Sequence, residues 1–169
     1  DIGIEEEYSI PVGNNLLFRL KDDITFGVEI CEDLWAPISP SDFLSVNGAH
    51  IILNLSASNE TISKRAYRRE LVKMHSAKNM SAYVYTSAGN KESTTDLIFS
   101  GHSIIAENGM LAAENSKLLD SGYILVSDID IGKIKSDRLK YKTFSDCRSA
   151  FSGTLRPKTI KIPYMPKSN

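Results

Sequence analysis

"HIILNLSASNETISKRAYRRELVKMHSAKN", residues 50–79, places a strand, a polar loop and a helix in immediate succession. The nearly continuous apolar run 50–55 predicts a strand that is buried on both faces. Residues 64–79 predict a helix, with lysines and arginines on its outer face. Its apolar positions fall at helical spacing: Tyr67, Leu71, Met74 and Ala77 or Lys78. Together these elements indicate a layered α/β fold, with strands packed against helices on one face.

Upstream of this stretch the sequence predicts a hairpin and a short helix. Strands are expected at 15–20 and 24–31, with the turn "KDD" between them. A helix is expected within 39–49, where Ser39 or Ser41 can cap its start and Asn47-Gly48 ends it.

Downstream, further strands alternate with turns and one short helix. Asn108-Gly109 is a strong signal for a hairpin turn. The predicted elements are, in order, a strand at 82–87, a hairpin within 102–115, a strand at 122–130 and a helix at 131–140. Residues 153–169 hold three prolines without periodicity and are interpreted as a linker or strap.

Composition excludes several classes of protein. The 169 residues suggest one domain, and 20 basic against 21 acidic residues argue against a nucleic-acid surface or a polybasic membrane contact. No apolar run approaches the ~20 residues that span a bilayer, and the start of the chain does not resemble a signal peptide. Cys31 and Cys147 lie far apart, and the three histidines lack metal spacing. We therefore expect no disulfide framework and no metal site, and a cytoplasmic location.

The first cysteine lies in "FGVEICEDLWAP", residues 26–37, where a strand breaks into acids and a proline. A cysteine at such a corner can expose its sulfur as a nucleophile, and the following backbone N–H groups can stabilise an oxyanion. The alternative is a buried core cysteine. A GxCxG-type elbow is missing, which weakens an interpretation as a Cys-His-Glu amidotransferase or a cysteine protease.

A second group of polar residues follows the strand at 50–55. The loop "NLSASNETISK", residues 54–64, offers hydroxyls and an amine: Ser56, Ser58, Asn59, Thr61 and Lys64. If strands 24–31 and 50–55 are neighbours, this loop lies beside Cys31 and suits the α-amino-acid head of a small substrate. Simple capping of the following helix by Ser58, Thr61 or Ser63 is equally compatible with the sequence.

Several stretches resemble the carbon–nitrogen hydrolase (nitrilase) superfamily, and within it the glutaminase domains of the glutamine-dependent NAD synthetases. These stretches are "GVEICEDLWAPISP", "GAHIILNLSASNETISKRAYRR", "AYVYTSAGNKESTTDLIFSGHSIIAENG" and "DRLKYKTFSDCR". The resemblance covers residues from about 10 to 150. "ICEDLW", "NLSAS" and "ESTTDL" are specific to the synthetase branch, whereas "GHSII…NG" is a weaker pattern of the superfamily.

The resemblance implies an α-β-β-α sandwich of which this chain holds only a part. Residues 1–150 correspond to the C-terminal half of the glutaminase domain, and 151–169 to the start of a linker to a synthetase domain. The family uses a catalytic Glu, Lys and Cys, and the first two precede the Cys. No residue of this chain matches the family's Glu or Lys motif, so neither role is assigned, and the chain alone is expected to be inactive.

The resemblance also implies a role for individual residues. Cys31 matches the nucleophile, and the backbone N–H of Glu32 matches a donor of the oxyanion hole. Trp35 matches a wall of the substrate pocket, and Ser58 and Lys64 match contacts to glutamine. The family often has arginine at the Lys64 position, and lysine offers a point charge where arginine offers a bidentate fork.

The expected partners follow from the same resemblance. They are glutamine, a synthetase domain of the same parent chain and further copies of the protein in a homo-oligomer. The glutaminase part needs no cofactor, whereas the synthetase domain, which amidates deamido-NAD with the released ammonia, uses ATP and Mg. Another amidase or carbamoylase of the superfamily, or a non-catalytic assembly fragment, is the alternative.

Overall fold

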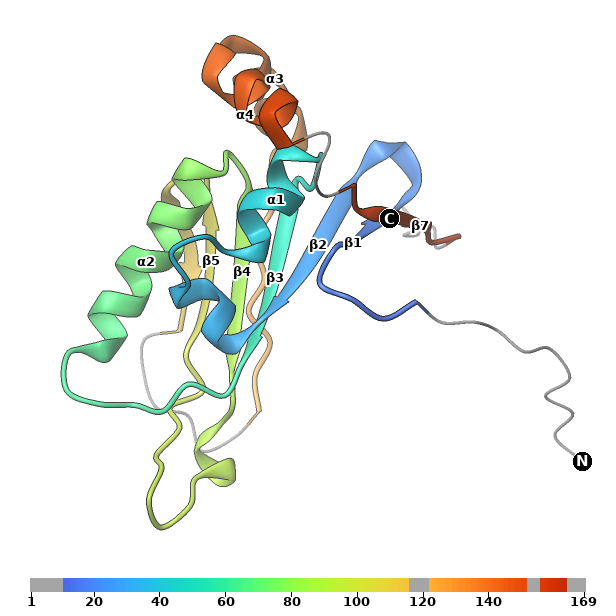
Figure 1. Cartoon of the computed structure of the whole chain (residues 1–169). Coiled ribbons are helices and arrows are strands. Elements are labelled where there is room, and N and C mark those ends of the chain that lie inside the picture. The colour runs from blue at the N-terminus through green and yellow to red at the C-terminus, as the bar shows by residue number, and fades with distance from the viewer. Residues whose placement is uncertain (1–10, 116–121, 152–155, 164–169) are drawn as a thin grey trace, which may run out of the picture.

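A computed structural model describes residues 11–115, 122–151 and 156–163. Its elements form one seven-stranded sheet in the order β6-β5-β4-β3-β2-β1-β7, together with four α-helices (Figure 1). The strands are β1 Leu16–Arg19, β2 Thr25–Ile30, β3 Ile51–Ser56, β4 Ala82–Ser87, β5 Ser103–Glu107, β6 Met110–Glu114 and β7 Lys158–Lys161. The helices are α1 Pro40–Val46, α2 Lys64–Lys78, α3 Ile131–Lys140 and α4 Lys142–Phe151, with 3-10 turns η1 Lys21–Asp23, η2 Cys31–Trp35 and η3 Asn90–Glu92.

The centre of the sheet is parallel. β2, β3 and β4 run side by side in the same direction, so their carboxyl ends meet at one edge. The two predicted hairpins flank this centre, β1 with β2 and β5 with β6. Asn108 and Gly109 turn the second hairpin with φ values of 46° and 85°, the positive φ that a tight type I′ turn requires.

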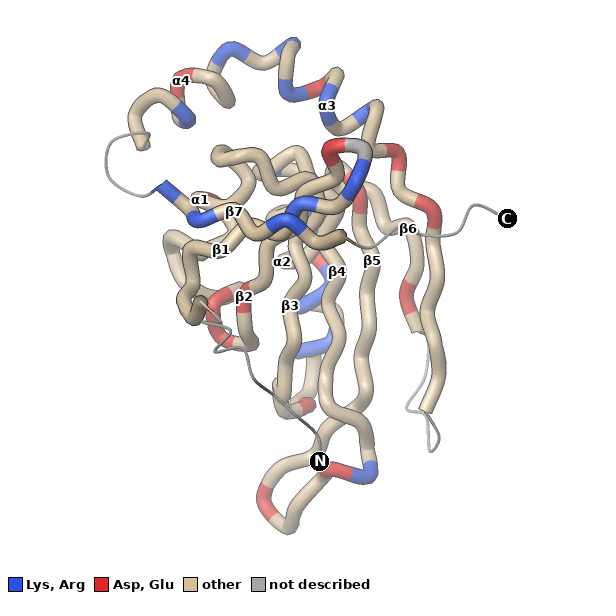
Figure 2. Tube along the Cα trace, turned by 90° about the vertical axis from the view of Figure 1, so that its right-hand side faces the viewer, with Lys and Arg blue, Asp and Glu red and all other residues tan. Residues whose placement is uncertain are grey.

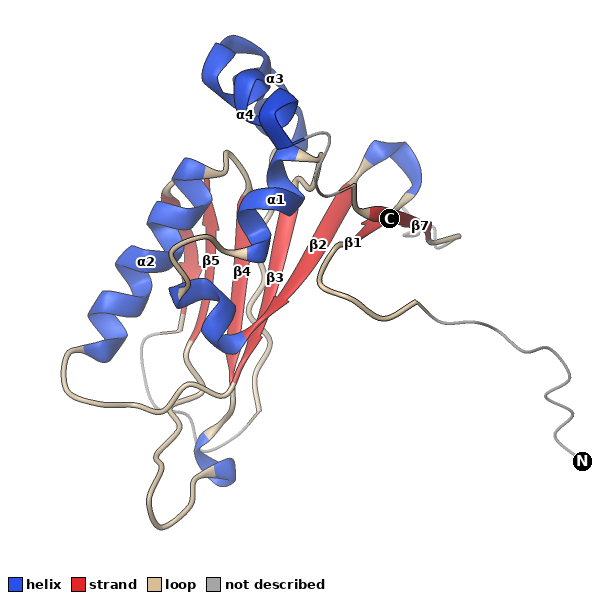
Figure 3. Ribbon diagram, viewed as in Figure 1, coloured by secondary structure: helices blue, strands red, loops and turns tan. Residues whose placement is uncertain are grey.

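Among the described residues, helices cover one face of the sheet and leave the other without a helical layer. α1 and α2 lie against it, while α3 and α4 lie beyond the end of the sheet where β3 and β4 begin (Figure 1, Figure 3). Close packing at α1 explains Gly27 in the middle of β2, because a Cβ atom there would lie 2.8 Å from Leu44 Cδ1. The core between helices and sheet includes Leu34, Leu44, Ile52, Val72, Tyr83, Tyr85 and Ile104.

The opposite face of the sheet is open and apolar. The prediction that the strand at 50–55 is buried on both faces is therefore wrong for this structure: Ile52 is buried, but Leu55 is 53% exposed. Ile30 on the neighbouring strand is 64% exposed. β3 and β4 contain no charged residue, as Figure 2 shows along both strands. The α-β-β-α sandwich has two sheets, and the described residues supply one sheet and one helical layer.

The buried face of α2 differs from the predicted one. Tyr67 is 60% exposed and Met74 is 63% exposed. The residues that face the sheet are instead Arg68, Val72, His75 and Ser76. Three of these four are polar, and of the predicted apolar positions Leu71 packs against the core. The helix spans 64–78, one residue less than the predicted 64–79.

Three further differences concern the C-terminal third. Residues 122–130, predicted as a strand, form no ladder in the described structure, although the helix predicted next is confirmed as α3. α4 was not predicted. Residues 158–161, within the segment interpreted as a linker, form β7 and pair in parallel with β1. Among the described helices none is long and apolar enough to cross a membrane.

Candidate functional site

Cys31 lies on a sharp strand-to-turn corner. The chain leaves β2 at Ile30 and enters η2 with Cys31 at φ 49°, a left-handed conformation that costs energy in a residue with a side chain. The Asp33 carboxylate closes this corner by accepting a hydrogen bond from the Ile30 N–H at 2.8 Å. Cys31 is half-buried, which does not fit the alternative of a fully buried core cysteine. The strained turn is present although the sequence has no glycine on either side of the cysteine.

Glu32 follows in the first turn of η2. Its side chain is exposed. Backbone N–H groups in the first turn of a helix have no carbonyl partner within that helix and so can face a developing negative charge. The geometry is thus compatible with the predicted role of its N–H.

The loop after β3 adjoins this corner. Ile30 pairs with Leu55 in the parallel ladder, so η2 and the loop leave neighbouring strands at the same edge. The Lys64 Nζ lies 5.7 Å from the centroid of the Trp35 ring, and it donates a hydrogen bond to Asn59 Oδ1 at 2.6 Å. Trp35 also packs against Tyr67, with 5.3 Å between ring centroids. The structure therefore brings two of the predicted substrate residues, Trp35 and Lys64, into contact.

Ser58 does not cap α2. That helix begins after Ser63, whose φ is 67° and whose side chain makes no capping hydrogen bond. Ser58 is 7% exposed, and its Oγ accepts a hydrogen bond from Arg68 Nη2 at 3.3 Å. Its backbone N–H donates to Ser87 Oγ at the end of β4. The loop is thus held from both α2 and β4.

Sequence reasoning missed Arg68, which is fully buried beneath this loop. Its Nη1 lies 3.2 Å from Glu60 Oε2 and 2.9 Å from His102 Nδ1. Burial alone would raise the pKa of Glu60, but hydrogen bonds from Ser100 and Arg68 outweigh it and lower the pKa, so the carboxylate stays charged. The helical spacing of residues 64–79 predicted that the arginines lie on the outer face of α2, so it did not indicate this contact.

His102 completes the buried cluster as a neutral ring. Burial is the largest cause that lowers its pKa to about 4, ahead of an opposing hydrogen bond with Glu114. Its Nε2 lies 2.8 Å from Glu114 Oε1, and Arg69 binds the same carboxylate with two nitrogens. No three histidine, cysteine or acidic side chains within the described ranges gather closely enough to hold a metal ion.

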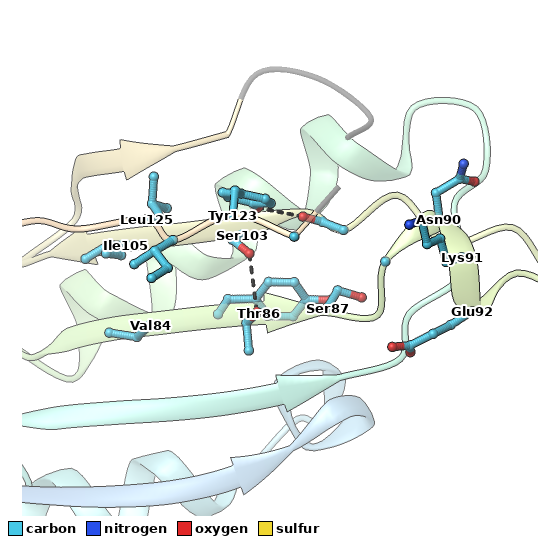
Figure 4. Close-up of a pocket in the computed structure, with 15 residues that line it drawn as sticks. Val84, Thr86, Ser87, Asn90, Lys91, Glu92, Ser103, Ile105, Tyr123 and Leu125 are labelled. Carbon is cyan, nitrogen blue, oxygen red and sulfur yellow. Dashed lines mark hydrogen bonds between the residues drawn. The ribbon is translucent and has the colours of Figure 1, made fainter. Parts of the chain in front are cut away.

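One hollow in the described structure lies away from the predicted site residues. About 530 Å³ opens on the uncovered face of the sheet, between β4, β5 and residues 122–125. Figure 4 shows Val84, Ile105 and Leu125 along it, and a hydrogen bond between the Thr86 and Ser103 hydroxyls. The two hydroxyl oxygens lie 3.3 Å apart. None of the predicted site residues lines this hollow. The second cysteine, Cys147, is exposed on α4, beyond the other end of the sheet (Figure 1).

Comparison with known proteins gives a consistent result. A family model described as carbon-nitrogen hydrolase matches residues 5–139. A glutamine-dependent NAD(+) synthetase of Mycobacterium leprae is 39% identical over 149 residues, covering 87% of this chain and 22% of the relative. The Homo sapiens protein of the same name is 33% identical and covers 80% of this chain and 19% of the relative. This chain thus spans about a fifth of the length of these curated relatives.

Solved structures agree with the fold. The crystal structure of a glutamine-dependent NAD(+) synthetase from Cytophaga hutchinsonii has a TM-score of 0.52 at 32% identity, covering 61% of this chain and 16% of that one. A carbon-nitrogen hydrolase from Helicobacter pylori has a TM-score of 0.59 at 20% identity, covering 80% and 50%. The second likeness bears on the fold alone.

Proposed function

Because the chain belongs to the carbon–nitrogen hydrolase family, we propose that it supplies the nucleophile and the substrate-binding loop of a site that hydrolyses the side-chain amide of glutamine. The curated relatives named as glutamine-dependent NAD(+) synthetases support glutamine as the substrate. In the complete protein the released ammonia would serve the conversion of deamido-NAD to NAD. That step would belong to an ATP- and Mg-using synthetase domain, and none of its chemistry is assigned to the described residues.

The reaction proceeds in two halves. The Cys31 thiolate attacks the amide carbon, and the oxyanion that forms accepts a hydrogen bond from the Glu32 N–H. The C–N bond then breaks, and the nitrogen leaves as ammonia after gaining a proton. Water attacks the resulting thioester, which releases glutamate and restores the thiol. A general base and a cation are needed for both halves, and the family's Glu and Lys would fill these roles from a segment not matched in this chain.

The other end of glutamine suits the loop after β3. The Lys64 ammonium and the Ser58 hydroxyl are donors for the α-carboxylate. The Trp35 ring forms an apolar wall beside Lys64, where the aliphatic part of the substrate can pack. Substrate hydrolysis would then depend on a loop that Arg68 holds through Ser58 and in which Asn59 holds the Lys64 ammonium.

One observation carries the proposal: the strained corner at Cys31 adjoins the contact between Trp35 and Lys64. The test is to assay the complete protein with glutamine and with a panel of other carboxamides and carbamoyl compounds. We expect glutamine to be hydrolysed, Cys31→Ala to abolish hydrolysis and Cys147→Ser to preserve it. Faster turnover of another amide would favour a different amidase of the family, and no turnover of any amide would favour a non-catalytic role.

A further inference from the structure

A buried arginine, Arg68, holds the loop that is proposed to bind glutamine. Arg68 is 0% exposed, and its guanidinium bonds to three consecutive residues of the loop: Ser58 Oγ at 3.3 Å, Asn59 O at 3.4 Å and Glu60 Oε2 at 3.2 Å. Its centre also lies 5.7 Å from the centroid of the Tyr85 ring. Burying a charged side chain this deeply is costly unless it is well paired.

The direction of one hydrogen bond matters for binding. A guanidinium can only donate, so the Ser58 oxygen must be the acceptor of the bond from Arg68. The single proton of the Ser58 hydroxyl is then turned away from Arg68 and is available to an acceptor on the other side. An α-carboxylate is such an acceptor. Without Arg68 the hydroxyl could rotate and turn its lone pairs towards the carboxylate.

On this basis we infer that Arg68 is a positioning residue for substrate binding, acting through the Ser58 hydroxyl, the Asn59 carbonyl and the Glu60 carboxylate. It fixes the loop in the binding conformation and fixes the orientation of the Ser58 proton before the substrate arrives. Pre-organisation of this kind raises affinity because binding does not then carry the entropy cost of ordering the loop. The inference rests on the proposed glutamine site.

A merely structural arginine offers the matched control. Arg138 on α3 donates to the carbonyl oxygens of Ala49, Asn79 and Met80, near the starts of β3 and β4 and away from the loop. Its guanidinium is also deeply placed, so burial lowers its pKa to about 10. Arg138→Gln should therefore lower thermal stability without changing substrate affinity.

The experiment measures kcat and KM for glutamine and the melting temperature in the complete protein. Arg68→Gln and Arg68→Lys should each raise KM for glutamine by about tenfold or more, since the single nitrogen of a lysine ammonium cannot reproduce the bonds that Arg68 makes from Nη1 and Nη2. Ser58→Ala should raise KM comparably, and Arg68→Lys added to it should raise KM little further, because both changes remove the same interaction.

Each result bears on the inference. A normal KM in Arg68→Lys with a lowered melting temperature, or fully additive effects with Ser58→Ala, would overturn it and leave the proposed function standing. If the Arg68 variants do not fold, Ser58→Ala decides, because a normal KM there overturns the inference as well. Absence of glutamine hydrolysis in the wild-type protein would overturn the proposed function and this inference together.

Discussion

The Lys64 ammonium lies over the ring of Trp35, with Nζ 5.7 Å from the ring centroid. The two residues are 29 positions apart and come from different elements, α2 and η2. The contact therefore ties the proposed substrate loop to the turn that holds Cys31. Asn59 holds the same ammonium at 2.6 Å, so the charge is fixed in place before any ligand binds.

Lys64→Ala should raise the KM for glutamine by about tenfold or more in the complete protein, the effect of losing one hydrogen bond to a charged group. Synthesis of NAD from added ammonia should be unchanged, because ammonia bypasses this site. Lys73→Ala serves as the control, since Lys73 lies on the same helix but pairs with Glu70 at the surface. An unchanged KM in Lys64→Ala would refute the assigned role of the ammonium.

Cys31 rather than Cys147 should react with a glutamine-mimicking electrophile such as diazo-oxo-norleucine. Cys31 lies at the strained corner beside the substrate loop, whereas Cys147 is exposed on α4 far from it. Peptide mapping of the labelled complete protein measures the site of the adduct, and excess glutamine should protect it. An adduct mainly on Cys147, or labelling that glutamine does not slow, would count against a nucleophilic Cys31.

Several features of this site could be predicted from the sequence because their signals are local. Residues 50–79 hold the strand, loop and helix in the predicted order, and Asn108-Gly109 forms the predicted turn. The placement of the loop 54–64 beside Cys31 needed one further assumption, that β2 and β3 are neighbours, and the sheet confirms this assumption.

The buried cluster behind the loop could not be predicted, because its signals are not local. Arg68 can be buried because Glu60 and Ser58 in the loop and His102, just before β5, supply partners for its guanidinium. Periodicity counts apolar residues and therefore placed Tyr67 inside and the arginines outside. A charged side chain can lie on the buried face of a helix when tertiary partners offset the cost of its desolvation. The spacing of residues along the helix does not reveal whether such partners exist.

Stability should fall as the pH falls from about 6.5 towards about 4, because burial lowers the pKa of both His50 and His102 to about 4. Between these values the unfolded chain binds protons that the folded chain does not, so unfolding is favoured. The stability that the two neutral histidines contribute is fully present above pH 6.5 and is lost as the pH falls from about 6.5 to about 4. The measurement is the melting temperature of the complete protein at several pH values, with His102→Gln expected to show a shallower decline. An equally steep decline in that variant would contradict a buried neutral His102.

Residues 1–169 expressed alone should show no glutaminase activity. The Cys31 thiol needs a base and a cation, and no motif in this sequence matches the Glu and Lys that supply them in the family. Removing one member of a catalytic unit can cost as much as removing all of them. The open sheet face, with Ile30 and Leu55 more than half exposed, should also make the isolated chain associate or lose structure.

The measurement for this prediction is glutamate release by the isolated chain, followed by the same assay after the upstream segment of the complete protein is added in trans or by fusion. Activity should appear only when that segment is present, because it would bring the base and the cation and would cover the apolar face with a second sheet. Light scattering before and after addition should show the association reversed. Appreciable turnover by residues 1–169 alone would mean that the base lies within this chain, and the acidic residues nearest the corner, Glu29, Glu32 and Asp33, would then be the first to replace.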